Sequence, residues 1–208
     1  MGNMQLLQLK SDKLDIREMR LIDNAVAALK NQLGILDNIS DSVKIAVGTR
    51  AFQSEATNVD EIITREVNLL LIQEPSKTCI YNPQNQRLTA NADKKLLNRV
   101  FHNVFEHVRL NTLRGAKILI KSSTDEKRGQ IRIEIMDDGE ALLSENFEPI
   151  FDLLSKLDLR NMGGRWDNGN LLGFSKILLR QMRGDITALD NNGVGAKFVI
   201  TLPLTDTD

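Results

Sequence analysis

The chain has few aromatic residues, one cysteine and no long apolar run, and each shortage excludes a class of protein. Phe, Trp and Tyr make up 4% of its 208 residues, which argues against the aromatic platforms on which nucleic-acid bases stack. The single cysteine, Cys79, excludes an internal disulfide framework and favours a reducing compartment. No apolar run approaches the roughly 20 residues that span a bilayer. We therefore expect a cytoplasmic protein with no membrane span in this chain.

The chain also lacks an excess of charge of either sign. It has 27 basic and 28 acidic residues, which gives a net charge of −1. Such a balance provides no bulk attraction to nucleic acid or to anionic lipid, so we expect no nucleic-acid partner. Histidine is scarce as well, since His102 and His107 are the only two. Because no Gly-x-Ser-x-Gly elbow is present either, the sequence does not favour a Ser/His/Asp hydrolase.

The N-terminal quarter of the chain is dominated by one helical pattern. Between residues 12 and 50, a seam with alternating spacings of four and three consists of Ile22, Val26, Leu29, Leu33, Leu36, Ser40, Val43 and Val47. This heptad spacing is typical of a long helix that packs against another helix. We predict that residues 1–52 form a helical dimerisation or hairpin segment and that the protein is a homodimer through it. The alternative is a helix that lies along the core of its own domain.

The rest of the chain alternates between helical and extended patterns. Residues 48–57 are predicted to be a polar linker, after which Asn58 and Glu61 have the spacing of a capping box. Helices are predicted from this box to Pro75, over 93–110 and over 172–182, with a weaker one over 144–157. Strands are predicted over 78–81, 87–90, 117–121, 130–136, 185–189 and 196–202. This pattern predicts a second domain over residues 58–208.

One strand ends in a motif that has two interpretations. Ile131, Ile133 and Ile135 alternate with charged residues, as in a strand with one buried face, and the strand runs into Asp137-Asp138-Gly139. Gly139 allows a close approach of backbone, so Asp137 can stand at the floor of a ligand pocket. The alternative is an ordinary Asp-Gly turn.

The order of these elements and their motifs resembles the C-terminal half of sensor histidine kinases. The matching segments are Asn103–His107, Asp137–Ala141, Phe147–Phe151, Gly169–Leu172 and Gly193–Ala196. The resemblance covers residues 58–203, and residues 16–52 are more weakly similar to the second helix of the kinase dimerisation hairpin. It implies a GHKL (Bergerat-fold) ATPase domain, an α/β two-layer sandwich, preceded by a long N-terminal helix for dimerisation.

The resemblance also implies a metal site on one helix. In the family, that helix carries Asn-x-x-x-Asn, and the side-chain oxygens hold the magnesium that bridges the phosphates. Asn103 matches the first position, whereas His107 occupies the second. Magnesium prefers hard oxygen ligands to imidazole, so Asn103 is the one metal ligand carried over. The alternative interpretation places both histidines on a solvated helix face.

On the adenine side, the family has Asp-x-Gly-x-Gly, whose Asp accepts a hydrogen bond from the adenine amino group. Asp137 and Gly139 match this motif, and Ala141 replaces its second Gly. The segment Phe147–Phe151 is similar to the Phe-Glu-Pro-Phe sequence that opens the ATP lid. The resemblance also assigns Gly195, which precedes the last strand, to the nucleotide pocket.

On the phosphate side, the family has Gly-Leu-Gly-Leu at the start of a helix whose backbone N–H groups cradle the phosphates. Gly169 matches the first Gly, and Leu171 replaces the second. Leu171 therefore puts a side chain where the phosphates approach bare backbone. An alternative alignment uses Gly173 instead.

Two functions follow from these motifs. The first is a two-component signalling protein with a degenerate nucleotide site, which acts mainly by binding a response regulator or a histidine kinase. The second is an active catalytic module that uses ATP and magnesium and phosphorylates a His supplied in trans or by a missing segment. In that module, the residues assisting near the phosphates would be Glu106, Lys156, Arg160 or Arg165. No residue is assigned a catalytic role with assurance.

Overall fold

The computed structural model describes residues 15, 17–26, 29, 40, 52–83, 88–152 and 170–205. Residues 17–26 are helical, and the helix begins with a capping box in which Asp15 Oδ1 accepts a hydrogen bond from Glu18 N at 2.8 Å and Asp15 N donates to Glu18 Oε2 at 2.9 Å. Along the predicted seam, Val26 is buried and Leu29 is 40% exposed. Most of the other seam positions lie outside the described residues, so the division at residue 52 stays a prediction.

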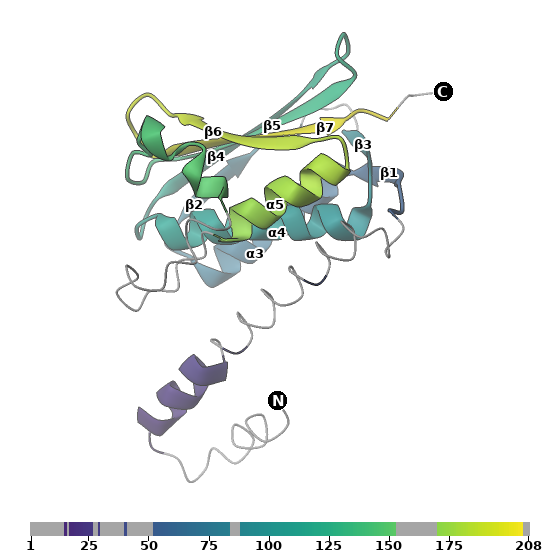
Figure 1. Cartoon of the computed structure of the whole chain (residues 1–208). Coiled ribbons are helices and arrows are strands. Elements are labelled where there is room, and N and C mark those ends of the chain that lie inside the picture. Colours follow the sequence, from purple (N-terminus) through teal and green to yellow (C-terminus); the bar gives the residue numbers. More distant parts are fainter. Residues whose placement is uncertain are drawn as a thin grey trace.

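In the described part of the chain, three long helices cover one face of a five-stranded sheet (Figure 1). The helices are α3 (Val59–Gln73), α4 (Lys94–Asn111) and α5 (Asn170–Gln181). The sheet has the order β2-β4-β5-β7-β6 and consists of β2 (Thr78–Tyr81), β4 (Lys117–Asp125), β5 (Gln130–Asp137), β7 (Ala196–Pro203) and β6 (Asp185–Asp190). Only the β2–β4 pair is parallel. The predicted α/β two-layer sandwich is confirmed.

The core lies between the sheet and the helices because each strand buries alternate residues. Ile131, Ile133 and Ile135 of β5 are at most 1% exposed, whereas the charged residues between them are partly exposed. Phe101 of α4 and Phe198 of β7 are among the largest fully buried side chains. Burial of an Ile or Phe side chain contributes about 1.5–3 kcal/mol, so this layer holds the strand that carries Asp137 in place.

The N-cap predicted at Asn58 is confirmed, since Asn58 Oδ1 accepts a hydrogen bond from Glu61 N at 3.3 Å, and Glu61 Oε1 accepts from Asn58 Nδ2 at 3.3 Å. The linker predicted over residues 48–57 is partly wrong. Its end forms β1 (Glu55–Asn58), which pairs with β3 (Thr89–Ala92) in a separate two-stranded sheet. Thr57 is buried there, and its hydroxyl donates to Ala92 O at 3.2 Å. A polar stretch becomes a strand here because its partner supplies the hydrogen bonds.

The segment predicted to be weakly helical over residues 144–157 contains two 3-10 turns, Ser144–Asn146 and Pro149–Phe151. Its remainder and most of the following Gly-rich segment lie outside the described residues. None of the described helices combines the length and the apolar composition that crossing a membrane requires.

Candidate functional site

A cleft of about 770 Å³ opens between α4, the end of β5 and the segment that follows it. Its volume lies within the roughly 300–1,000 Å³ of small-molecule sites. Its polar lining consists of His107, Asn111, Asp137, Glu140 and Asn146. The remaining lining residues are apolar, and they include Leu142, Ile150 and Phe198. Two of the residues predicted from the sequence, His107 and Asp137, therefore face one cavity.

Asp137 is buried at the end of β5 and organises the backbone around it. Its Oδ1 accepts hydrogen bonds from Gly139 N at 2.9 Å and from Ala196 N at 3.3 Å. Its backbone carbonyl accepts a third bond from Asn191 Nδ2 at 3.0 Å. Burial raises the pKa of the Asp137 carboxyl above its usual value, while the two N–H groups act in the opposite direction. The carboxyl thus joins the end of β5 to the start of β7, and the backbone carbonyl joins it to the loop before β7.

Two glycines let this loop approach Asp137. Gly195 has a φ of +63°, and a Cβ placed on it would lie 2.0 Å from Asp137 O. Its N–H donates to Gly139 O at 3.0 Å, and its carbonyl accepts from Leu142 N at 3.1 Å. A Cβ on Gly139 would lie 2.9 Å from Asp137 Oδ1. The structure therefore brings Gly139 and Gly195, both predicted site residues, against the predicted carboxylate.

His107 is buried in the cleft and is only 7% exposed, so its placement on a solvated helix face is wrong. Its ring stands edge-on to Phe198, with 5.4 Å between ring centroids and an interplanar angle of 87°. Asn111 Nδ2 donates to His107 O at 2.8 Å and lies 3.3 Å from His107 Nδ1. The Asn111 amide therefore contacts both the backbone and the ring of His107.

His102 lies on a different side of α4 and does not line the cleft. Its Nδ1 lies 3.2 Å from Oε2 of Glu66, a buried residue of α3. The hydrogen bond with Glu66 raises the pKa of the His102 imidazole. The pKa of Glu66 is lowered by His102 and Arg65, although its burial acts in the opposite direction. This pair connects α3 to α4.

Asn103 lies between helices and is absent from the cleft lining. It is 3% exposed, and its Nδ2 donates a long hydrogen bond of 3.5 Å to Leu171 O in the first turn of α5. The same carbonyl accepts a bond from Ser175 Oγ at 2.8 Å. The predicted residues Asn103 and Leu171 therefore meet each other at the α4–α5 contact. Gly169 lies outside the described residues.

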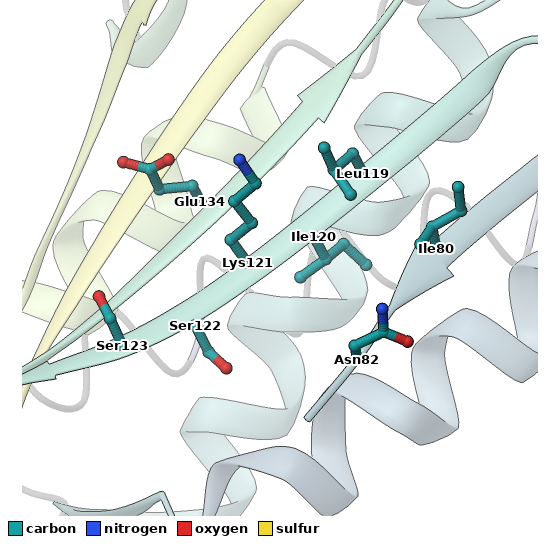
Figure 2. Close-up of a pocket in the computed structure, with 8 residues that line it drawn as sticks. All are labelled: Ile80, Asn82, Leu119, Ile120, Lys121, Ser122, Ser123 and Glu134. Atoms are coloured by element: carbon teal, nitrogen blue, oxygen red, sulfur yellow. The ribbon is translucent and has the colours of Figure 1, made fainter. Parts of the chain in front are cut away.

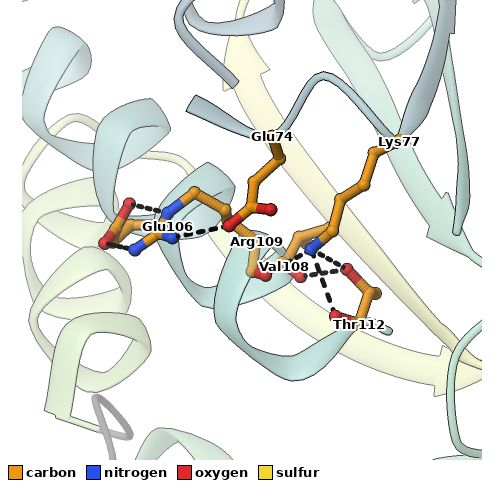
Figure 3. A network of polar contacts seen from close by, with 6 residues as sticks. All are labelled: Glu74, Lys77, Glu106, Val108, Arg109 and Thr112. Carbon is orange, nitrogen blue, oxygen red and sulfur yellow. Dashed lines mark hydrogen bonds and ion pairs between the residues drawn. The ribbon is translucent and has the colours of Figure 1, made fainter. Parts of the chain in front are cut away.

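The end of α4 is held by a lysine that the sequence did not point to (Figure 3). Lys77 is 5% exposed, and its Nζ donates to Arg109 O at 2.5 Å, Thr112 O at 3.1 Å and Thr112 Oγ1 at 2.9 Å. An ammonium group at these carbonyls complements the negative end of the helix. Burial lowers the pKa of Lys77, while Glu74 acts in the opposite direction. Arg109 adds ion pairs to Glu106 and to Glu74.

The segment that borders the cleft is attached to α5 through a second buried lysine. Lys176 Nζ lies 3.3 Å from Glu148 Oε2 and 4.5 Å from the centre of the Phe151 ring. An ammonium group over an aromatic face is attracted by the ring quadrupole. The Phe147–Phe151 segment matches the start of the family's ATP lid. The contact with Lys176 helps to hold it against the core, where Ile150 is buried.

Sequence reasoning missed three residues that support the site, namely Lys77, Asn111 and Asn191. Asn111 stands four positions after His107, the spacing that places two side chains on one helix face. That spacing was a usable signal. No local signal marks Lys77 or Asn191, because their partners Thr112 and Asp137 are distant in the sequence.

One of the two positions of the implied magnesium site on α4 lacks an oxygen ligand. His107 offers an imidazole where a hard oxygen ligand is needed, and the side-chain N–H group of Asn103 is directed to α5. Among the residues that the structure describes, no cluster of three His, Cys, Asp or Glu side chains could hold a metal ion. The end of β5, where Gly139 and Gly195 lie against Asp137, is called the Asp137 corner. It presents a buried carboxylate to a cavity, which suits a ligand with N–H donors.

A second hollow of about 370 Å³ lies at β2, β4 and β5 (Figure 2). Its lining includes Ile80, Leu119, Lys121 and Glu134. It contains none of the predicted site residues, so the larger cleft is the candidate site.

Comparisons with known proteins show what the chain is similar to. Residues 92–206 match the model of the histidine kinase-, DNA gyrase B-, and HSP90-like ATPase family. The chain is 25% identical over 210 residues to the sensor protein EvgS of Escherichia coli K12, covering 97% of this chain and 17% of that protein. It is also 25% identical over 206 residues to the sensor protein GacS of Pseudomonas syringae pv. syringae, covering 94% of this chain and 22% of that protein. The chain thus spans about a fifth of the length of these relatives.

Among solved structures, the histidine kinase AdeS of Acinetobacter baumannii has the same fold. The TM-score is 0.67 at 13% sequence identity, and the match covers 99% of this chain and 93% of that one. At this identity the likeness speaks for the fold alone.

Proposed function

The chain belongs to the histidine kinase-, DNA gyrase B-, and HSP90-like ATPase family, and we propose that it is a two-component signalling protein with a degenerate nucleotide site. Its cleft keeps the Asp137 carboxylate that would accept adenine, whereas His107 replaces one of the two metal-binding side chains of the family. The protein then acts mainly by binding a partner, which is a response regulator or a histidine kinase. The N-terminal segment over residues 1–52, predicted to be helical, serves as its dimer contact, and the single cysteine suits a cytoplasmic location.

The burial of His107 in the cleft is the observation that carries this proposal. The side chain takes the position of the second metal-binding Asn and packs its ring against Phe198. Asn103, at the first position, is directed to Leu171 O. Of the two residues, His107 lacks the hard oxygen that magnesium needs, and Asn103 alone carries one.

The charge of the lining supports the same conclusion. Among the described lining residues, the acidic side chains are Asp137 and Glu140, and no Lys or Arg is present. A triphosphate requires cations to offset its charge, as the P-loop lysine and magnesium do elsewhere. Within the described lining, ATP would meet two carboxylates and no cation.

Isothermal titration of the full chain with ATP and magnesium tests the proposal. We expect no binding in the micromolar range. His107→Asn is the matched variant, since it restores the family pattern on α4 and leaves Asp137 in place. Micromolar binding of magnesium-ATP by the unchanged chain would refute the proposal.

The intact Asp137 corner favours a second candidate, an active catalytic module that phosphorylates a His of another segment. Its test is the transfer of label from [γ-³²P]ATP to a partner dimerisation domain. Transfer that disappears in Asp137→Asn, a variant that keeps the side-chain shape, would support this candidate. Absence of transfer to every dimerisation domain tried would count against it.

A further inference from the structure

The five-stranded sheet has one face that no described helix covers. The helices α3, α4 and α5 all lie on the other face (Figure 1). On the open face, Ile80 of β2, Leu119 of β4 and Met136 of β5 adjoin one another, because Leu119 pairs with both of the others in the strand register. Ile80 is 46% exposed and Leu119 is 36% exposed. Adjoining exposed apolar side chains mark a contact surface, whereas single ones are normal. These three residues are called the apolar row.

A hollow of about 370 Å³ lies beside the apolar row, and Ile80 and Leu119 line it. Figure 2 shows Leu119 and Lys121 on one side of β4, with Ile120 and Ser122 on the other side. The burial along the strand follows the same division, since Ile120 and Ser122 are buried and their neighbours are exposed. The hollow therefore opens on the uncovered face, where it can receive an apolar side chain of a partner.

The acidic side chains that the same alternation places on this face are all in ion pairs. Glu134 contacts two cations of the face, with Arg132 Nη2 at 2.8 Å from Oε1 and Lys197 Nζ at 3.8 Å from Oε2. The other two pairs are Asp125 with Arg128 at 3.6 Å and Asp185 with Arg180 at 3.5 Å. A further cation on this face therefore takes its counter-charge from another molecule.

Two such cations flank the middle of the apolar row. Lys117 and Lys121 stand two positions before and after Leu119 on β4, so all three side chains lie on one face at intervals of about 6–7 Å. Neither ammonium group has a hydrogen bond or an ion pair with a described residue. Lys121 pairs with Glu134 in the strand register, but that carboxylate is held by the two cations named above. The face thus presents an apolar centre with a positive charge on either side.

The spacing of the apolar row fits a helix laid across the strands. Neighbouring strands lie about 4.7–4.9 Å apart, and one turn of an α-helix rises about 5.4 Å. A helix in this direction places one apolar side chain per turn over Ile80, Leu119 and Met136 in succession. The side chains of an extended segment return to the same face only every 6–7 Å or so, which matches the row less well. Carboxylates on both flanks of the helix would then meet Lys117 and Lys121.

We propose that the open face of the sheet docks an amphipathic helix of a partner protein. Its apolar stripe covers Ile80, Leu119 and Met136, and its flanking carboxylates pair with Lys117 and Lys121. This inference goes beyond the function proposed above, since it assigns a surface and the chemistry of what binds there. It holds whether or not the cleft binds ATP.

The test is titration of the full chain with a labelled synthetic peptide, followed by fluorescence anisotropy. The peptide has about 18 residues, which is long enough for a helix, with Leu along one stripe, Glu on both flanks and Ala elsewhere. The matched peptide has Lys in place of every Glu. The acidic peptide should bind about tenfold more tightly than the basic one or better, and added salt should reduce the difference.

Two pairs of variants locate the binding surface. Leu119→Ser should weaken binding of the acidic peptide about tenfold, because it removes the centre of the apolar row. Leu69→Ser is its control, since Leu69 is 40% exposed on α3 in the other layer, and it should leave binding unchanged. Lys121→Gln should weaken binding about threefold, whereas Lys95→Gln on α4 should have no effect. Thermal melting checks that each variant is folded.

Equal binding of the two peptides, binding of neither, or an equal loss in Leu69→Ser would overturn the proposal. Sedimentation velocity of the chain alone tests a second copy as the occupant. Self-association that Leu119→Ser abolishes would assign the face to that copy and overturn the proposal as well. Leu119 and Lys121 do not line the larger cleft, so these results leave the degenerate site untouched. Micromolar binding of magnesium-ATP would refute the degenerate site and leave the docking surface untouched.

Discussion

The Asp137 corner and the α4 side of the cleft differ in how closely their geometry is tied to the fold. At the corner, Asp137 bonds three backbone or side-chain groups, and Gly195 leaves no room for a Cβ. On α4, His107 contributes to the site through its side chain, whose ring packs against Phe198. Residues at a site built from backbone contacts cannot be substituted without loss of stability, whereas residues at a site built from helix side chains can be substituted.

Replacement of Gly195 by Ala should have the largest effect, because it breaks the corner itself. Its Cβ would lie 2.0 Å from Asp137 O at a φ of +63°, so we expect a loss of about 3 kcal/mol or more in the free energy of unfolding. Gly193→Ala is the matched control, since Gly193 has a φ of +75° with nothing within 4 Å. It should lose only about 1 kcal/mol. Equal losses in urea unfolding would show that the approach to Asp137 is unimportant.

Removal of the Asp137 carboxyl should have the next largest effect. Asp137→Ala leaves Gly139 N and Ala196 N without an acceptor, so the free energy of unfolding should fall by about 2 kcal/mol. Asp137→Asn keeps an acceptor oxygen and should lose less than about 1 kcal/mol. Denaturant unfolding measures both, and an Ala variant as stable as the Asn variant would refute the structural role of Oδ1.

The pair of His102 and Glu66 should have the smallest effect, because it lies away from the cleft and the His102 side chain is 57% exposed. The raised pKa of His102 means that its contribution is full below its ordinary pKa of about 6.5 and fades as pH rises through the folded value. The lowered pKa of Glu66 means that its contribution is full above about 4.5 and fades as pH falls through the folded value.

His102→Gln isolates the contribution of this pair. The difference in unfolding free energy between the unchanged chain and the variant should be largest near pH 5.5. It should shrink by about 0.5 kcal/mol by pH 9, a small change because solvent screens the exposed partner. A difference that stays constant with pH would show that the pair is not charged in the folded protein.

The fold was predictable wherever local patterns were strong. The Asn58–Glu61 cap is a contact between near neighbours, and the alternating isoleucines mark β5 by their period along the chain. β1 escaped because its polar residues carry no period, and it becomes a strand only by pairing with β3. Local sequence patterns thus located helices and strands, whereas pairing with a distant strand determined β1.

The site was predictable at its backbone corner and less so on α4. Asp137, Gly139 and Gly195 come together because a strand end and a Gly-containing loop carry them. The burial of His107 depends on Phe198, 91 positions along the chain, and the burial of Lys77 depends on Thr112. Polar residues on a helix appear exposed until such distant partners are in place.

Binding of a divalent ion on α4 tests the central claim most directly. Mn²⁺ takes oxygen ligands as magnesium does and is visible by electron paramagnetic resonance. We predict that the spectrum of Mn²⁺ with ATP does not change when the chain is added at up to equimolar concentration. A stoichiometric, protein-dependent change in that spectrum, abolished by Asn103→Ala, would contradict the account.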